Sequence, residues 1–178
     1  MPELVEPTVA LRESFVAAMQ EFREEGRGGD STMVGTDLVR WGGRWNTVAG
    51  FAAYVGSVIY DREEAAPRDA GRVPSTTLWW GDGSHYLGRI AIRHRLTPAL
   101  RELGGHIGYD VRRSARRQGH ATAMLAAALP LAASLGIDPV LVTCDDTNLG
   151  SRKVIEGNGG VLEDQRGVKL RFWVPTSA

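Results

Sequence analysis

The residues best placed for chemistry lie in the short segment Arg116–Ala121, where Arg116, Gly119 and Ala121 follow the pattern Arg-x-x-Gly-x-Ala. An alanine-rich segment, 121–135, comes directly after it and has the composition of a helix. The N-terminus of a helix has unpaired N–H groups and the positive end of the helix dipole, so it attracts anions. A glycine at 119 lets a phosphate approach the backbone closely. We therefore expect this segment to bind a pyrophosphate.

The segment matches neither of two common phosphate-binding loops. A Walker loop would end in Gly-Lys-Ser/Thr and a dinucleotide fingerprint would read Gly-x-Gly-x-x-Gly, and neither is found here. Taken alone, the six residues would also fit a solvated basic turn. A nucleic-acid patch on Arg112, Arg113, Arg116 and Arg117 is disfavoured, because 21 basic residues balance 21 acidic ones and no aromatic residues are interleaved.

The flanking elements decide how this loop is positioned. Before it, residues 105–111 alternate as a strand should, with Ile107, Tyr109 and Val111 on one face and His106, Gly108 and Asp110 on the other. The remaining pattern predicts helices at 11–22, 45–59 and 149–156, and strands at 75–80, 86–96, 140–143, 161–163 and 168–174, with turns at 81–83 and 166–167. This order indicates an α+β or mixed α/β chain.

The composition is that of an ordinary globular protein. With 178 residues, 43% hydrophobic and 24% charged, the chain is expected to form one globular domain, 1–178. The single cysteine, Cys144, can form no internal disulfide and falls short of a zinc pattern. The N-terminus is acidic, unlike a signal peptide, and no run reaches the roughly 18 apolar residues of a membrane helix. We expect a cytoplasmic protein that binds neither membrane nor metal.

A second motif follows the first. The strand 140–143 leads to Asn148, then Ser151, then a helix closed by Gly159-Gly160. With Val111 ending the earlier strand and Arg116, Gly119 and Ala121 after it, the chain resembles the GNAT superfamily of N-acyltransferases over about residues 75–175. The resemblance implies a mostly antiparallel central sheet, with two parallel strands that splay apart and helices on both faces.

The resemblance also implies a binding mode for acetyl-CoA. The backbone of Val111 would hold the pantetheine arm like an added strand, and Asn148 and Ser151 would lie on the pantetheine side of the cleft. The pyrophosphate would be bound by the loop, whose cofactor-binding residues would be Arg116, Arg117, Gln118, Gly119, His120, Ala121 and Thr122.

The chain departs from the family pattern at two positions. The family's proline after the strand is Arg113 here. The tyrosine that protonates the departing CoA thiolate in many members is Ile155, so the general acid must be another group or water. This second departure is the main support for an alternative function, a non-catalytic acyl-CoA-binding module.

Candidates for acid–base chemistry are His106, Tyr109 and Glu102. His106 is the first candidate for the base because an unperturbed histidine pKa of about 6.5 suits the task. A histidine hydrogen-bonded within the sheet and a tyrosine packed in the core are the competing interpretations. Cys144 is expected to be a small buried hydrophobe rather than a nucleophile. The resemblance implies direct transfer in a ternary complex, which fits this better.

The sequence thus predicts an N-acetyltransferase that acts on a primary amine of a small molecule or peptide. The acceptor is expected against the helix 45–59 and near Asp82–His85, where acidic residues would suit a cationic amine. The sequence does not decide whether the acyl donor is acetyl-CoA or another acyl-CoA. It does not decide the oligomeric state either, since the apolar strand Leu170–Val174 would allow a homodimer.

Overall fold

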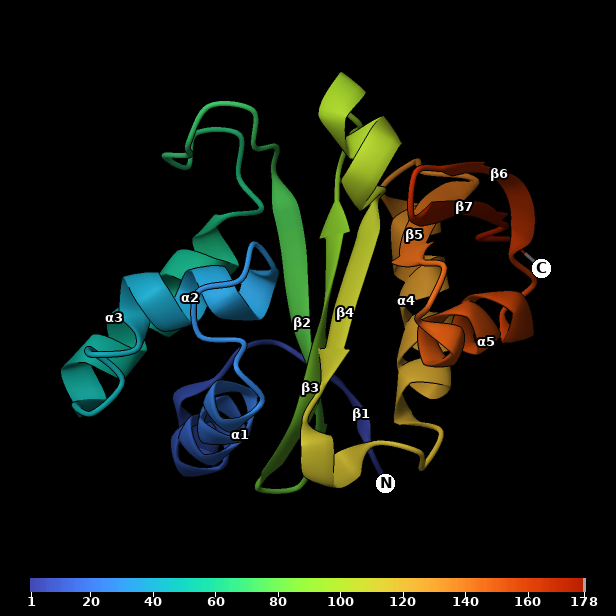
Figure 1. Ribbon diagram of the computed structural model, residues 1–178. Helices are drawn as coiled ribbons and strands as arrows, with labels where there is room; N and C mark the ends of the chain where they lie inside the picture. Colours follow the sequence, from blue (N-terminus) through green and yellow to red (C-terminus); the bar gives the residue numbers. More distant parts are fainter. Residues whose placement is uncertain (178) are drawn as a thin grey trace.

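A single seven-stranded sheet runs through the computed structural model, which describes residues 1–177 (Figure 1). The strand order is β1-β2-β3-β4-β5-β7-β6. All pairs are antiparallel except β4 and β5, which are parallel. The strands are β1 (Glu3–Val5), β2 (Ser75–Asp82), β3 (His85–Arg93), β4 (Ile107–Val111), β5 (Val140–Asp145), β6 (Val161–Arg166) and β7 (Lys169–Val174).

The parallel pair makes the opening that positions the site. β4 and β5 are paired only at Ile107 and Val142, and beyond that point the two strands diverge (Figure 1). The expected mixed, mostly antiparallel sheet with two splayed parallel strands is confirmed. A strand edge freed in this way offers unpaired N–H and C=O groups to an extended ligand.

Helices cover both faces of the sheet (Figure 1). On one face lie α1 (Arg12–Glu24), α2 (Met33–Trp41) and α3 (Val48–Tyr60), whereas α4 (His120–Ser134) and α5 (Leu149–Gly157) cover the other. Short helical turns are formed by Val9–Leu11, Leu100–Gly104 and Arg113–Ala115. None of the helices in residues 1–177 combines the length and apolar character that crossing a membrane requires.

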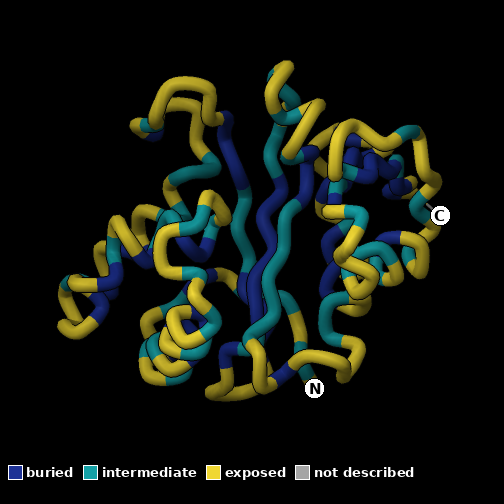
Figure 2. The backbone as a smooth tube through the Cα atoms, in the orientation of Figure 1, coloured by how far each residue is buried: buried dark blue, intermediate teal, exposed yellow. Residues whose placement is uncertain are grey.

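Each face of the sheet has its own hydrophobic core, and the buried residues lie between sheet and helices (Figure 2). Phe15, Met19 and Phe22 of α1 recur at helical spacing and pack with Trp79 of β2. Alternation along β4 sends Ile107, Tyr109 and Val111 to the opposite core, under α4 and α5, as predicted. The central strands therefore carry one group of side chains toward α1–α3 and another toward α4 and α5.

Several boundaries differ from the predicted ones. The helix expected from residue 45 begins at Val48, because the Thr47 hydroxyl caps it by accepting from the Gly50 N–H group, while Trp45 packs in the core before it. The turn expected at 81–83 lies at 83–84, because β2 continues through a bulge at Trp80/Gly81 to Asp82. Similarly, β6 continues to Arg166, so the last turn falls at 167–168.

Two elements were not predicted. The helix α2 begins at Thr32, whose hydroxyl accepts from the Gly35 N–H group, but glycines at 28, 29 and 35 obscure its pattern. The strand β1 has only three residues, and its pairing with β2, far along the chain, leaves no local signal.

Candidate functional site

A groove of about 740 Å³ opens where β4 and β5 diverge. Its walls are the end of β4, the loop after it, the first turn of α4 and the first turn of α5. Of the ten residues predicted to bind the cofactor, only Gln118 does not line this groove; its amide donates instead to the Ser114 carbonyl. The nine that do are Val111, Arg116, Arg117, Gly119, His120, Ala121, Thr122, Asn148 and Ser151.

The loop ahead of α4 presents its backbone amides to the groove. Arg117 and Gly119 both adopt positive φ, 62° and 82°, which turns the chain sharply into the helix. Within residues 1–177, the N–H groups from Arg117 to Thr122 donate to no other backbone carbonyl, and no side chain caps the helix. A Cβ atom at Gly119 would meet nothing within 4 Å, so this position faces open space. The arrangement is that of an anion site at a helix N-terminus.

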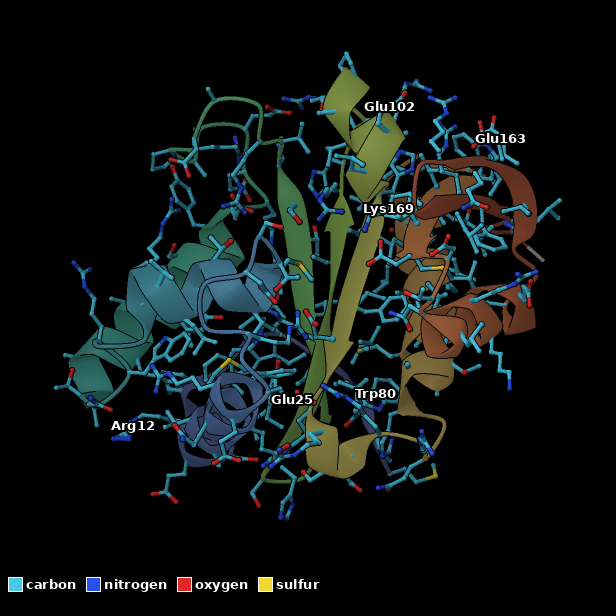
Figure 3. All side chains as sticks on the ribbon, viewed as in Figure 1. Arg12, Glu25, Trp80, Glu102, Glu163 and Lys169 are labelled. Atoms are coloured by element: carbon cyan, nitrogen blue, oxygen red, sulfur yellow. The ribbon has the colours of Figure 1, made fainter. Side chains whose placement is uncertain are left out.

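The Arg116 side chain serves mainly to fix the loop in place. The Arg116 guanidinium donates to both carboxylate oxygens of Glu25 at 2.6 and 2.8 Å, and its Nε donates to the Val111 carbonyl at 2.9 Å. Glu25 follows directly after α1 and lies beside the end of β4 (Figure 3). Arg116 lines the groove, but its charge is already shared with this carboxylate.

A second ion pair holds the start of the loop. The Glu21 carboxylate of α1 accepts from Arg112 Nε at 3.0 Å, from the Ser114 N–H group at 3.0 Å and from the Ser114 hydroxyl at 2.8 Å. Burial alone would raise the pKa of Glu21, but the hydrogen bonds from Arg112 and Ser114 outweigh it and lower the pKa from 4.5 to about 2.

The low pKa of Glu21 means that its contribution to the stability of the loop can be tested by changing the pH. Because the folded pKa lies below the unfolded one, its stabilisation is present above about pH 4.5 and is lost as the pH falls toward 2. We expect Glu21→Gln to lower the free energy of unfolding at pH 7 by about 1–3 kcal/mol, measured by urea titration. The matched control is Glu24→Gln, which removes an exposed pair with Arg113 and should cost under about 1 kcal/mol. Equal losses in both variants would contradict this role.

The free edge of β4 runs from the loop toward the point where the strands meet. The Arg112 N–H group donates to the Leu87 carbonyl, so the alternate residues Asp110 and Gly108 form the ladder with β3. Tyr109 and Val111 consequently direct their backbone groups toward β5, where no strand pairs with them. The Val111 carbonyl is used by Arg116, which leaves the other backbone groups of this edge for a ligand.

The Tyr109 side chain lies on the same side of the strand as α5. Its hydroxyl is 2.7 Å from the Ser151 hydroxyl, and Ser151 is held in turn by Asn148, whose side chain accepts from the Ser151 N–H group at 3.0 Å. Burial raises the pKa of Tyr109 to about 12. The phenol therefore keeps its proton at neutral pH and can act as a donor within the groove. Ile155, at the position of the family tyrosine, is buried in the core beneath α4 and α5.

The His106 side chain is hydrogen-bonded within the sheet. Its Nδ1 accepts from the Leu141 N–H group of β5 at 2.9 Å, and its ring does not line the groove. Burial, followed by the nearby charges of Arg101 and Arg93, lowers the pKa of His106 to about 4. The ring is therefore neutral at pH 7, and the hydrogen bond joins β4 to β5 where they begin to splay.

The hydrogen bond from Leu141 allows a test of whether His106 has a structural or a catalytic role. Because the folded pKa is depressed below about 6.5, the stability contributed by neutral His106 is complete above pH 6.5 and is lost as the pH falls toward 4. In His106→Asn the side-chain oxygen can still accept from Leu141. We expect urea titrations of this variant to lose part of the rise in stability between pH 4 and 6.5, while kcat changes only a few fold. Loss of transfer with an unaltered stability profile would assign the histidine to catalysis.

The remaining candidates do not line the groove. Glu102 is exposed at the opposite end of the sheet, where it forms an ion pair with Arg166 of β6 (Figure 3). Cys144 is 5% exposed, and burial raises the pKa of its thiol, which disfavours the reactive thiolate. In the described part of the chain no group of three or more His, Cys, Asp and Glu side chains could hold a metal ion.

A second groove, of about 680 Å³, lies on the other face of the sheet. It is enclosed by α2, the end of α3, the loop 61–73 and the central strands β2 and β3. Trp41 forms part of its wall, whereas Trp45, Trp79 and Trp80 are core residues. The acceptor region predicted at the helix 45–59 thus meets this groove only through the end of α3. Asp82 and His85 line neither groove, and Asp82 binds the N-terminal amino group.

Side chains from the segment after α1 lie between the two grooves. Arg27 donates to Asp30 at 3.0 Å, to Asp110 of β4 at 2.8 Å and to the Thr32 hydroxyl at 2.7 Å. Arg27 and Asp110 line the first groove, while Thr32 and Met33 line the second. The grooves therefore approach each other at β4 from opposite sides.

Fold and site together define an acyltransferase-like architecture, with a splayed parallel pair and an anion-binding helix start. A model of the acetyltransferase (GNAT) domain matches residues 32–161, and the chain belongs to this family. A search of curated protein sequences finds no significant match.

Solved structures with this fold share little sequence with the chain. The microcin C7 self-immunity acetyltransferase MccE, solved with acetyl-CoA and AMP, aligns with a TM-score of 0.64 at 12% identity over 98% of this chain and 92% of its own. RimJ from Mycobacterium smegmatis, solved with a CoA disulfide, gives a TM-score of 0.63 at 17% identity over 97% and 80%. The ribosomal-protein acetyltransferase RimL, solved with CoA, gives 0.61 at 14% identity over 97% and 92%.

Proposed function

We propose that the protein transfers the acetyl group of acetyl-CoA to a primary amine by direct transfer in a ternary complex. The observation that carries the proposal is the continuity of the first groove, whose free amides at the start of α4 lead to the unpaired edge of β4. A pyrophosphate and an extended amide-bearing arm need these two features in this order.

The residues present fit such a ligand. The amides of 117–122 and the positive end of α4 would hold the pyrophosphate, and Gly119 leaves room for it. The backbone of Tyr109 and Val111 would pair with the pantetheine arm, next to Asn148 and Ser151. When bound, acetyl-CoA supplies an activated acyl thioester.

Tyr109 is the proposed proton donor for the departing thiolate, in place of the family tyrosine. It has a protonated hydroxyl within the groove, two positions from the point where β4 and β5 meet. The bond to the Ser151 hydroxyl fixes the ring, and the proton that the amine nitrogen loses as the amide forms can restore the phenol through this hydroxyl or through water. Cys144 takes no part, since its thiol stays protonated in the core.

The test is release of CoA thiol from acetyl-CoA in the presence of a panel of primary amines, with mass spectrometry of the acetylated product. We expect release above the rate of hydrolysis for at least one class of amine. Tight binding of acetyl-CoA without transfer to any amine would instead indicate a binding module. Faster release from propionyl- or succinyl-CoA would assign another acyl donor.

A further inference from the structure

The second groove carries an excess of positive charge. Five arginines and three aspartates line it. Three of the arginines are paired, Arg89 with Asp37 at 2.6 Å, Arg40 with Asp69 at 2.6 Å and Arg68 with Asp61 at 3.6 Å. The other two, Arg72 and Arg93, have no carboxylate within ion-pair distance among residues 1–177. A half-enclosed groove in which five arginines outnumber three aspartates, and two guanidinium groups form no ion pair, is suited to an anion.

Arg89 adds donors that lack a partner. The residue is only 2% exposed, and one nitrogen of its guanidinium donates to Asp37 and to the Tyr54 hydroxyl. Its Nε and Nη2 are buried and find no acceptor in the described part of the chain. Unpaired buried donors cost free energy, and the Arg89 guanidinium adds positive charge beneath the groove.

Arg93 lies beside β4, close to the point where β4 and β5 begin to diverge. Its guanidinium donates to the carbonyl groups of Gly104 and Gly105 at 3.0 and 3.1 Å. It also lies against β4, since a Cβ atom at Gly108 would be 3.6 Å from its Nη2. Gly108 follows Ile107, the residue at which β4 pairs with β5. Burial, followed by the charge of Arg72, lowers the pKa of Arg93, so the two guanidinium groups lie close enough to repel each other.

We propose that the acceptor is a small amine that also carries a carboxylate or a phosphate, and that Arg93 and Arg72 bind this anionic group. The inference rests on the proposed transfer to an amine. With the anion held beside Gly108, on the face of the sheet that α1–α3 cover, the amine would reach the thioester at the free edge of β4 from this same face, past the side chains around Arg27. The groove has the volume of a small-molecule site, and its charge disfavours polyamines and other purely cationic acceptors.

The first experiment compares amines that differ only in their anion. The CoA-loaded protein is titrated by calorimetry with leucine and leucinamide, and with phosphoethanolamine and ethanolamine; bound CoA keeps the pyrophosphate site from taking up the anion. Transfer from acetyl-CoA to the same four amines gives KM and kcat. We expect the anionic member of at least one pair to bind at least about tenfold more tightly and to show the lower KM. A preference in the leucine pair identifies a carboxylate, and one in the ethanolamine pair a phosphate.

Variants then assign the preference to the groove. Arg72→Gln, on an exposed loop, and Arg93→Gln should each raise the KM of the preferred anionic amine by about 10- to 100-fold and its kcat much less. The matched control is Arg40→Gln, which lines the same groove but is already paired with Asp69, and should leave this KM within a few fold.

Two results would overturn the inference. One is equal or tighter binding of both neutral amines, and the other is an anionic preference that Arg72→Gln leaves intact. Failure of the proposed function looks different, because it would appear either as no binding of acetyl-CoA to the folded protein before any amine is added, or as binding without transfer to any amine, anionic or neutral.

Discussion

Glutamate in place of Gly119 is expected to abolish acetyl-CoA binding. The position faces open space at the start of α4, so the carboxylate would extend into the anion site and both block and repel the pyrophosphate. In the native protein, ligand at about 100 times its Kd should stabilise the fold by about 2.7 kcal/mol, which raises the Tm. The variant should show no such shift.

The control for this change lies at the other end of the same helix. Gly136 also has positive φ, 76°, and open space at its Cβ position, so Gly136→Glu brings a similar backbone strain and the same charge outside the groove. It should lower the Tm of the free protein but keep the full shift with acetyl-CoA. A shift of native size in Gly119→Glu would place the pyrophosphate elsewhere.

Phenylalanine in place of Tyr109 is expected to lower kcat by about 100-fold or more, with little change in the KM for acetyl-CoA. General acid catalysis contributes about 10²–10⁴ in rate, and this change removes the proton while the ring keeps its packing. Steady-state kinetics with the best amine of the panel measure the effect. The leaving thiolate would then depend on water for its proton.

Tyr86→Phe provides the comparison. Tyr86 is likewise buried, but it lies in the core under α1 and α3, outside both grooves, and its hydroxyl has no partner within residues 1–177. We expect it to keep native kcat. A Tyr109→Phe variant with native kcat would assign the proton to another donor, and a large rise in KM would make Tyr109 a binding residue instead.

The loop and its helix could be predicted because their signal is local. Gly119 and the alanine-rich helix stand next to each other in the sequence, and nine of the ten residues expected around the cofactor do line one groove. The alternation of β4 also follows from neighbouring residues, so the side of the strand that carries Tyr109 could be derived. The splay between β4 and β5 was implied only by the family resemblance, since it depends on which strands pair.

The features that sequence reasoning missed depend on distant partners. His106 stood out as a base by its residue type, but its Nδ1 is occupied by Leu141, 35 positions away. The bond between Tyr109 and Ser151 spans 42 positions and has no signature in the chain. Arg89 and Arg93 are four residues apart on β3, so strand alternation predicts that they share one face of the sheet. The sequence does not predict that Arg72, from the loop before β2, lines the same groove.

The most direct test of the account is calorimetric titration of the native protein with acetyl-CoA. We predict one site per chain with micromolar affinity, because the amides of 117–122 and the edge of β4 are already in place to receive it. A folded protein that releases no heat and gains no thermal stability with acetyl-CoA would contradict the account, whatever amines are offered.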